Sequence, residues 1–147
     1  MTPKIYTIGY QGRRFMEFVT TLRAHDIRTV VDIRGGPVSA RVSTFHDAVL
    51  PSALARATVN YIPMHELGIP HGEYSETADD HSCAEVFKSY RSKLKRSKRG
   101  VVKALVGVVV ESPTALMCVE RNAATCPRCI LAEVLAETTG LEVVHLQ

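Results

Sequence analysis

The segment TALMCVERNAATCPRCILAEVL, Thr114–Leu135, is the most informative part of the sequence about the fold. Thr114–Val119 is a short apolar run of the kind that forms buried strands. From Cys126 onwards apolar side chains recur at helical spacing, which places Cys126 in the first turn of a helix. A helix N-terminus offers free N–H groups and a partial positive charge, and both stabilise an anion or a thiolate. We therefore expect a reactive or ligand-binding site where this strand meets this helix.

The rest of the chain repeats the alternation of strand and helix. Five strands are predicted, at Lys4–Ile8, Thr29–Ile33, Asn60–Met64, Thr114–Val119 and Glu142–Leu146. Helical patterns separate them, and 101–110 is assigned to a helix because the chain must cross back before the fourth strand. Strands separated by helices favour a parallel sheet covered on both faces. The predicted fold is a single α/β domain, 1–147, with a mostly parallel central sheet of about five strands in a Rossmann-like, three-layer arrangement. Within it, 65–82 is predicted to be a long loop and 95–100 a basic connection.

Composition excludes several classes of protein. The 147 residues are 46% apolar and 22% charged, which is typical of one globular domain. No apolar run approaches the roughly 20 residues of a membrane span, and Met1–Tyr10 lacks the apolar core of a secretory signal. Four cysteines at uneven spacing do not suit a secreted disulfide framework. We expect a cytoplasmic protein without a membrane partner, whose cysteines are thiols or metal ligands.

Chemically active side chains follow several of the predicted strands. Right-handed crossovers place the carboxyl ends of all the strands at one edge of the sheet, where ligands of open α/β folds bind. The predicted catalytic residues are Cys126 as nucleophile or thiolate, Glu120 or Asp32 as acid or base, and Cys118. The predicted anion-binding residues are Arg13, Arg34, Arg121 and Arg128. An anionic, phosphate-bearing small molecule is the expected partner, and we expect Cys126 to be less buried than Cys118.

Two of these assignments have structural alternatives. Asp32 and Arg34 could form an ion pair that serves only the fold. Cys118 faces either the core or the site, because strand alternation places Met117 and Val119 on the opposite face.

The motifs of this chain resemble those of an uncharacterised family called domain of unknown function 488. The signature is an apolar strand ending in Cys-x-Glu, followed by a loop and by Cys-His-Arg at the start of a helix, where this chain has Pro127 in place of the histidine. The resemblance extends to Tyr6-Thr7-Ile8-Gly9-Tyr10, Val31-Asp32-Ile33-Arg34 with Pro37, Leu67-Gly68, Phe87 with Tyr90, and Val143-Val144-His145-Leu146. It implies a fold and the location of a site, and it supplies no reaction.

The sequence Cys126-Pro127-Arg128-Cys129 supports two alternative functions. A Cys-x-x-Cys pair at a helix N-terminus is typical of thiol-disulfide redox proteins. Alternatively, Cys126 and Cys129 could bind zinc together with Cys118 and one histidine, either His65, His71, His81 or His145. We otherwise expect no metal and no cofactor, with Cys129 on a partly buried helix face.

A dense basic block forms the last distinctive feature. Eight bases and no acid lie between Lys88 and Lys103. Such a block attracts polyanions, so a noncatalytic nucleic-acid-binding module is a further alternative. Its predicted nucleic-acid contacts are Lys95, Arg96, Lys98 and Arg99. Only Tyr90 is available there for base stacking, and a solvated helix end would have the same composition.

Overall fold

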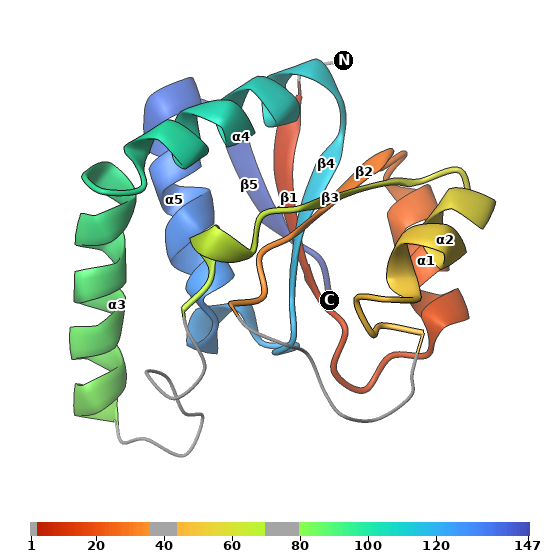
Figure 1. The fold of residues 1–147 in the computed structure, drawn as a ribbon, viewed down its shortest axis with the longest axis horizontal. Helices are drawn as coiled ribbons and strands as arrows, with labels where there is room; N and C mark the ends of the chain where they lie inside the picture. Colours follow the sequence, from red (N-terminus) through yellow and green to blue (C-terminus); the bar gives the residue numbers. More distant parts are fainter. Residues whose placement is uncertain (1–2, 36–43, 70–79) are drawn as a thin grey trace.

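The structure is a computed structural model that describes residues 3–35, 44–69 and 80–147. A central sheet lies between two layers of helices (Figure 1). Its strands are β1 (Lys4–Gly9), β2 (Thr29–Asp32), β3 (Asn60–Pro63), β4 (Thr114–Cys118) and β5 (Glu142–His145). The helices are α1 (Phe15–Ala24), α2 (Leu50–Arg56), α3 (Asp80–Lys95), α4 (Arg99–Glu111) and α5 (Pro127–Thr139), with short 3-10 turns η1 (His65–Leu67) and η2 (Ala123–Thr125).

All five strands are parallel, in the order β3-β2-β4-β1-β5. The central strand β4 pairs with β1 from Ile5 opposite Thr114 to Gly9 opposite Cys118, and with β2 on its other side. The carboxyl ends of β1, β2 and β4 are therefore adjacent, at the lower end of the sheet in Figure 1. This confirms the predicted α/β class and places Cys118 at the centre of that edge.

Strand alternation divides the interior into two cores. Ile5, Leu116 and Cys118 face the layer that contains α3, α4 and α5. Ile8 and Met117 face the other layer, where they pack with residues of α1 and α2. Because Cys118 lies on the α5 side, its thiol reaches the start of that helix.

The connections differ more from prediction than the strands do. The predicted long loop 65–82 contains the turn η1, and α3 already begins at Asp80; residues 70–79 lie outside the described part of the chain. A Cβ on Gly68 would lie 2.3 Å from the carbonyl oxygen of Ile33, so only glycine lets this segment pack against the end of β2.

The predicted basic connection 95–100 is also too long. Lys95 still belongs to α3 and Arg99 to α4, which leaves three residues between the helices. Lysine and arginine are good helix formers, and the buried Leu94 and Val102 anchor the two helix ends. The helix predicted over 101–110 is confirmed as α4.

In the described part of the chain, no helix combines the length and the apolar character that crossing a membrane requires.

Candidate functional site

Three potential ligand groups meet where β4 ends and α5 begins. Cys118 is the last residue of β4, Glu120 lies in the loop that follows, and Cys126 is the N-cap of α5. Their two sulfur atoms and a carboxylate oxygen all lie within 4.8 Å of one another. Cys118 Sγ is 3.4 Å from Glu120 Oε2. We call these three residues the cysteine cluster.

The end of β1 holds the loop of this cluster in place. The amide of Tyr10 donates to the carbonyl of Cys118, and the amide of Gln11 donates to the carbonyl of Val119 over 2.9 Å. A Cβ on Gly9 would lie 1.8 Å from the carbonyl oxygen of Glu120, which no side chain tolerates. The absence of a side chain at Gly9 thus allows β1 and the cluster loop to touch.

Burial governs the chemistry of the two thiols. Cys126 is completely buried and Cys118 is 8% exposed, so the expectation that Cys126 is the less buried thiol was wrong. The reason is that Cys126 packs into the core between the sheet and α5. Three effects raise the pKa of Cys118: a hydrogen bond with Cys126, burial, and the nearby charge of Glu120. Cys118 therefore keeps its proton at neutral pH unless a cation joins the cluster.

Tyr90 of α3 lies in the same core as Cys118 and Cys126, on the face of the sheet that packs against α3, α4 and α5. Burial, followed by the charges of Cys118 and Cys126, raises the pKa of its phenol. The hydroxyl donates to the carbonyl of Leu67 and is thereby occupied. Tyr90 is a wall of the site and keeps its proton.

Arg128 was predicted to bind an anion, and the structure places it inside the protein. Its side chain is fully buried in the first turn of α5. Nε donates to Thr7 Oγ1 over 3.1 Å, and the two terminal nitrogens donate to the backbone carbonyls of Glu120 and of Arg121, the latter over 3.0 Å. Arg128 thus fixes the cluster loop and contributes a buried positive charge beside it.

Arg13 and Arg121 lie near this charge and nearer to solvent. Arg13 is half-buried and donates from Nε to the carbonyl of Gly9 over 2.9 Å, whereas Arg121 is exposed. Burial lowers the pKa of Arg13, and the like charges of Arg121 and Arg128 lower it further. Within residues 3–35, 44–69 and 80–147, none of the three forms a salt bridge with a carboxylate. We call Arg13, Arg121 and Arg128 the arginine cluster.

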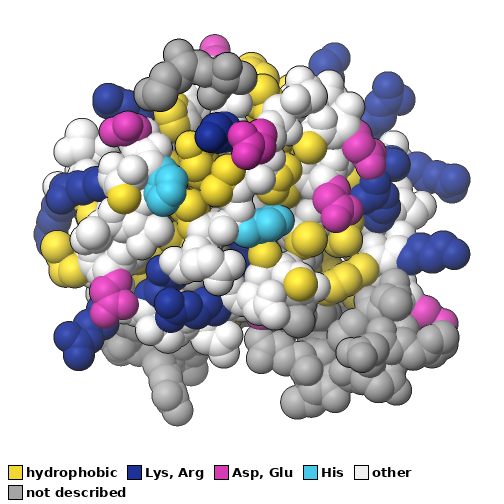
Figure 2. Space-filling model, turned by 180° about the vertical axis from the view of Figure 1, so that it is seen from behind, with side chains coloured by type: hydrophobic (Ala, Val, Ile, Leu, Met, Phe, Trp, Pro, Cys, Tyr) yellow, Lys and Arg dark blue, Asp and Glu magenta, His cyan; other side chains and the backbone are white. Residues whose placement is uncertain are grey.

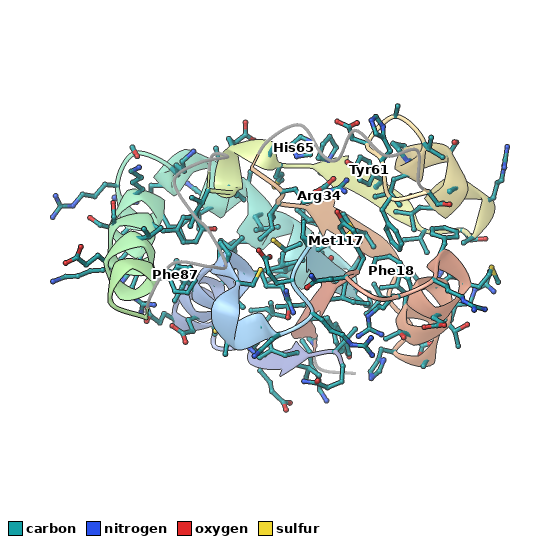
Figure 3. All side chains as sticks on the ribbon, turned by 90° about the horizontal axis from the view of Figure 1, so that it is seen from below. Phe18, Arg34, Tyr61, His65, Phe87 and Met117 are labelled. Carbon is teal, nitrogen blue, oxygen red and sulfur yellow. The ribbon has the colours of Figure 1, made fainter. Side chains whose placement is uncertain are left out.

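Asp32 and Arg34 form a separate group on the other face of the sheet. Arg34 donates from Nε and Nη2 to the two carboxylate oxygens of Asp32, over 2.8 and 2.6 Å, and both side chains are buried. The hydroxyl of Tyr61 donates to the same carboxylate over 2.6 Å. Burial lowers the pKa of Arg34, but its bonds to Asp32 outweigh burial and raise it. Figure 3 shows the labelled Arg34 close to Tyr61 and His65.

The predicted site residues are consequently divided between two groups. Cys118, Glu120 and Cys126 lie together, with Arg13, Arg121 and Arg128 beside them. Asp32 and Arg34 lie across the sheet, in the mutual ion pair that the sequence left open. The carboxylate of Asp32 is satisfied there by an arginine and a tyrosine.

Cys129 lies outside the cysteine cluster. It is half-buried, and its Sγ is 3.9 Å from Glu133 Oε1, one turn along α5. Burial and the charge of Glu133 raise its pKa. Among the described residues, the thiol of Cys126 is thus grouped with Cys118, at the end of β4, and the second cysteine of the Cys-x-x-Cys sequence is not part of that group.

Four histidines were predicted as possible zinc ligands. Two of them have other partners, and the side chains of the other two are not described. His65 Nδ1 is 2.7 Å from the carbonyl of Arg34, and His145 Nδ1 is 2.7 Å from Thr7 Oγ1. His71 is outside the described residues, and the side chain of His81 is too.

The basic block extends from the second half of α3 into α4. In Figure 2, Lys and Arg side chains project from the edge that carries α3, and acidic side chains lie between them. Arg91 pairs with Glu133 and Glu137 of α5, and Lys95 Nζ is 3.3 Å from Glu137 Oε2. Lys98 donates to the carbonyl of Glu66. Arg96 and Arg99 are exposed.

Sequence reasoning missed the residues that support the site. Thr7 and Tyr61 were predicted as residues of strands, and Tyr90 as the aromatic side chain available for base stacking in the basic block. Their polar groups bond to partners far away in the chain, so only the periodicity of buried positions was visible. A polar hydroxyl at a buried strand position, as at Thr7, was the one available signal.

A known family model matches most of the chain. A family model described as Domain of unknown function DUF488 matches residues 14–135. The match includes α5 up to Leu135 and the entire cysteine cluster, while Arg13 and Thr7 precede it. A search of curated proteins found no match to this chain.

Proposed function

The chain belongs to the family described as domain of unknown function DUF488, and from its site we propose that it binds a small phosphate-bearing anion at the carboxyl edge of β1 and β4. The cysteine cluster beside that anion is its reactive centre. The family description names no activity, so the proposal rests on the chemistry of the site.

One observation carries the proposal: the positive charges of Arg121 and Arg128 act on Arg13, the charge of Glu17 offsets only part of this effect, and within the described residues none of the three arginines forms a salt bridge with a carboxylate. The effect is visible at Arg13, whose pKa is lowered by burial and then by Arg121 and Arg128. Grouping like charges costs free energy, and a bound anion would recover it. Arg13 and Arg128 donate to backbone carbonyls, which carry no net charge.

Phosphate is the anion that suits this arrangement best. Guanidinium groups bind phosphate and carboxylate oxygens through two parallel hydrogen bonds, which a planar fork provides and a lysine does not. The start of α5 lies in the same region and adds a favourable dipole. Arg121 is exposed and Arg13 half-buried, so both can exchange a water partner for a ligand oxygen.

The cysteine cluster could contribute to chemistry in two ways. Cys126 could attack a bound substrate, as the sequence suggests, or the cluster could bind a cation that acts on the substrate. A nucleophile must contact the atom it attacks, and Cys126 has no exposed surface. The burial of both sulfurs beside a carboxylate favours coordination.

Calorimetric titration with inorganic phosphate and pyrophosphate tests the binding proposal. Arg121→Gln should weaken binding by about tenfold to a hundredfold, because a charge-assisted hydrogen bond contributes about 1.5 to 3 kcal/mol. Arg13→Gln should have an effect of similar size. Arg23→Gln is the matched control, because Arg23 is an exposed arginine in the last turn of α1. Equal binding by all four proteins, or no binding by the wild type, would refute the proposal.

A second candidate function is polyanion binding by the basic block. The exposure of Arg96 and Arg99 at the junction of α3 and α4 favours it. Against it, Arg91 and Lys95 are already paired with acids of α5. Fewer positive charges of the block are therefore available to a polyanion in the folded protein than the number of bases in the sequence suggests.

A further inference from the structure

We propose that Cys118, Glu120 and Cys126 bind one zinc ion through two thiolates and a carboxylate, and that the fourth coordination position faces the anion site. Zinc binding follows from the cysteine cluster alone. The identity of the fourth ligand rests on the proposed function, since it is the phosphate-bearing anion or a water molecule in its place.

The spacing of the three groups fits a tetrahedral zinc ion. Zinc–sulfur bonds of about 2.3 Å and zinc–oxygen bonds of about 2.0 to 2.2 Å place two sulfurs about 3.8 Å apart and a sulfur about 3.5 Å from an oxygen. The observed distance from Cys118 Sγ to Glu120 Oε2 is 3.4 Å. All three ligand atoms lie within 4.8 Å of one another, so small rotations of the side chains would complete the geometry.

Zinc also resolves the charge problem of the cluster. Two thiolates and a carboxylate would carry three negative charges where both sulfurs are buried, and burying charge without a counter-ion is costly. A divalent cation reduces the total to one negative charge. The buried Arg128, which donates to the carbonyl of Glu120, supplies one positive charge close by. Zinc, its three ligands and this arginine are together neutral.

The fourth position faces the solvent side of the cluster. Exposure increases from Cys126, which is fully buried, through Cys118 at 8% to the half-exposed Glu120. The core covers the sulfur side, so solvent or a ligand reaches the ion past Glu120. Arg121 follows Glu120 in the chain and is exposed. Three protein ligands and one open position are the arrangement of catalytic zinc sites, where the ion polarises a bound oxygen or lowers the pKa of a bound water.

This site differs from the zinc site suggested by the sequence. That site used Cys129 and a histidine in addition to Cys118 and Cys126. Cys126 is an N-cap with extended backbone angles, φ −124° and ψ 141°, whereas Cys129 belongs to the helix proper. The sulfur of Cys126 therefore meets Cys118, while that of Cys129 lies near Glu133. Glu120 takes the place of Cys129 as the third ligand.

Zinc affinity, measured in competition with a chromophoric chelator on the reduced protein, tests the inference. The wild type should bind one equivalent. Cys118→Ser and Cys126→Ser should each weaken binding by more than the roughly 10- to 100-fold cost of losing an outer-shell partner. Cys129→Ser is the matched cysteine control and should bind like the wild type. Glu120→Gln should weaken binding, and Glu133→Gln, on the exposed face of α5, should not.

Cobalt substitution supplies a second measurement that does not depend on the folding of a variant. The wild type with Co²⁺ should show thiolate-to-cobalt charge transfer and the intense visible bands of a tetrahedral ion. Spectra without charge transfer, wild-type protein that binds no zinc, or loss of zinc by Cys129→Ser would each overturn the assignment.

Titration of phosphate into the zinc-loaded protein separates this inference from the proposed function. Zinc bound with no detectable phosphate binding would retain the metal site and refute the anion site. Phosphate binding that depends on Arg121, in a protein without zinc affinity, would retain the anion site and refute the metal site.

Discussion

Thr7 of β1 and Arg128 of α5 are joined by a hydrogen bond of 3.1 Å between Oγ1 and Nε, inside the protein and 121 positions apart in the chain. Because the Thr7 oxygen accepts from Arg128, its own hydrogen is free to donate to His145 Nδ1, 2.7 Å away on β5. The hydroxyl therefore favours a neutral imidazole with the proton on Nε2. The position of Arg128, and with it the cluster loop, depends on this arrangement.

The stability of the protein should decrease with acidification through His145. Burial lowers the pKa of this imidazole from its usual 6.5, and the charge of Arg128 lowers it further. The unfolded chain then binds more protons than the folded one between the two pKa values, so the free energy of unfolding falls as pH drops below 6.5. Urea unfolding at a series of pH values measures the effect. His145→Gln should flatten the profile in that window, and an identical profile in the variant would contradict the assignment.

Gly9→Ala should damage the cluster loop. The new Cβ would lie 1.8 Å from the carbonyl oxygen of Glu120, so the backbone of the loop must move, at a cost of about 2 kcal/mol or more in unfolding free energy. Gly100→Ala is the control, because a Cβ there meets nothing within 4 Å at the start of α4. Alanine should stabilise that helix by up to about 1 kcal/mol. Equal stability of Gly9→Ala and the wild type in urea would show that the close contact is not tight.

Asp32→Asn should destabilise the fold without weakening the binding of zinc. It leaves Arg34, 3% exposed, without its carboxylate partner, and breaking a buried ion pair costs about 3 to 5 kcal/mol. Glu142→Gln breaks the exposed pair with Lys4 and should cost about 0 to 1 kcal/mol. Chemical denaturation gives both values. If Asp32→Asn unfolded like the wild type but lost anion binding, Asp32 would belong to the site after all.

The basic block gives a salt-dependence prediction. If it binds nucleic acid, the logarithm of the affinity should fall linearly with the logarithm of salt concentration, with a slope of about 0.7 to 0.9 for each phosphate contact. Replacing Arg96 and Arg99 together by Ser should reduce that slope by about two contacts. Replacing Lys95 and Lys98 should reduce it less, since they already contact Glu137 and the carbonyl of Glu66. A slope that neither double change alters would leave the block as a solvated surface.

The sequence predicted the sheet well because strand and helix differ in periodicity. Each predicted strand is present and ends within one residue of its prediction, since apolar runs such as Thr114–Val119 have few other structures available. Parallel order then followed from the helical connections. The joint between β4 and α5 was found for the same reason.

The arrangement of side chains at the sheet edge was less predictable. Val31 pairs with Leu116 in the register of β2 and β4, which sends Asp32 and Cys118 to opposite faces. Alternation within one strand does not reveal this, because the register between strands is set by packing. Arg128 was also misplaced, since arginine is rarely fully buried and its acceptors lie on distant segments. Glu120 was predicted as an acid or base and Cys129 as a possible zinc ligand, because spacing along the chain does not show that Glu120 lies beside both buried thiols.

X-ray absorption at the zinc edge of the loaded, reduced protein is the sharpest test of the zinc site, because it counts the atoms that bind the ion. The cysteine cluster predicts two sulfurs at about 2.3 Å and two oxygen or nitrogen neighbours at about 2.0 to 2.2 Å. The second light atom is the anion or water at the fourth position, and Cys129→Ser should leave the spectrum unchanged. Three sulfur neighbours in the wild type, falling to two in Cys129→Ser, would contradict the account and return the site to the Cys-x-x-Cys pair.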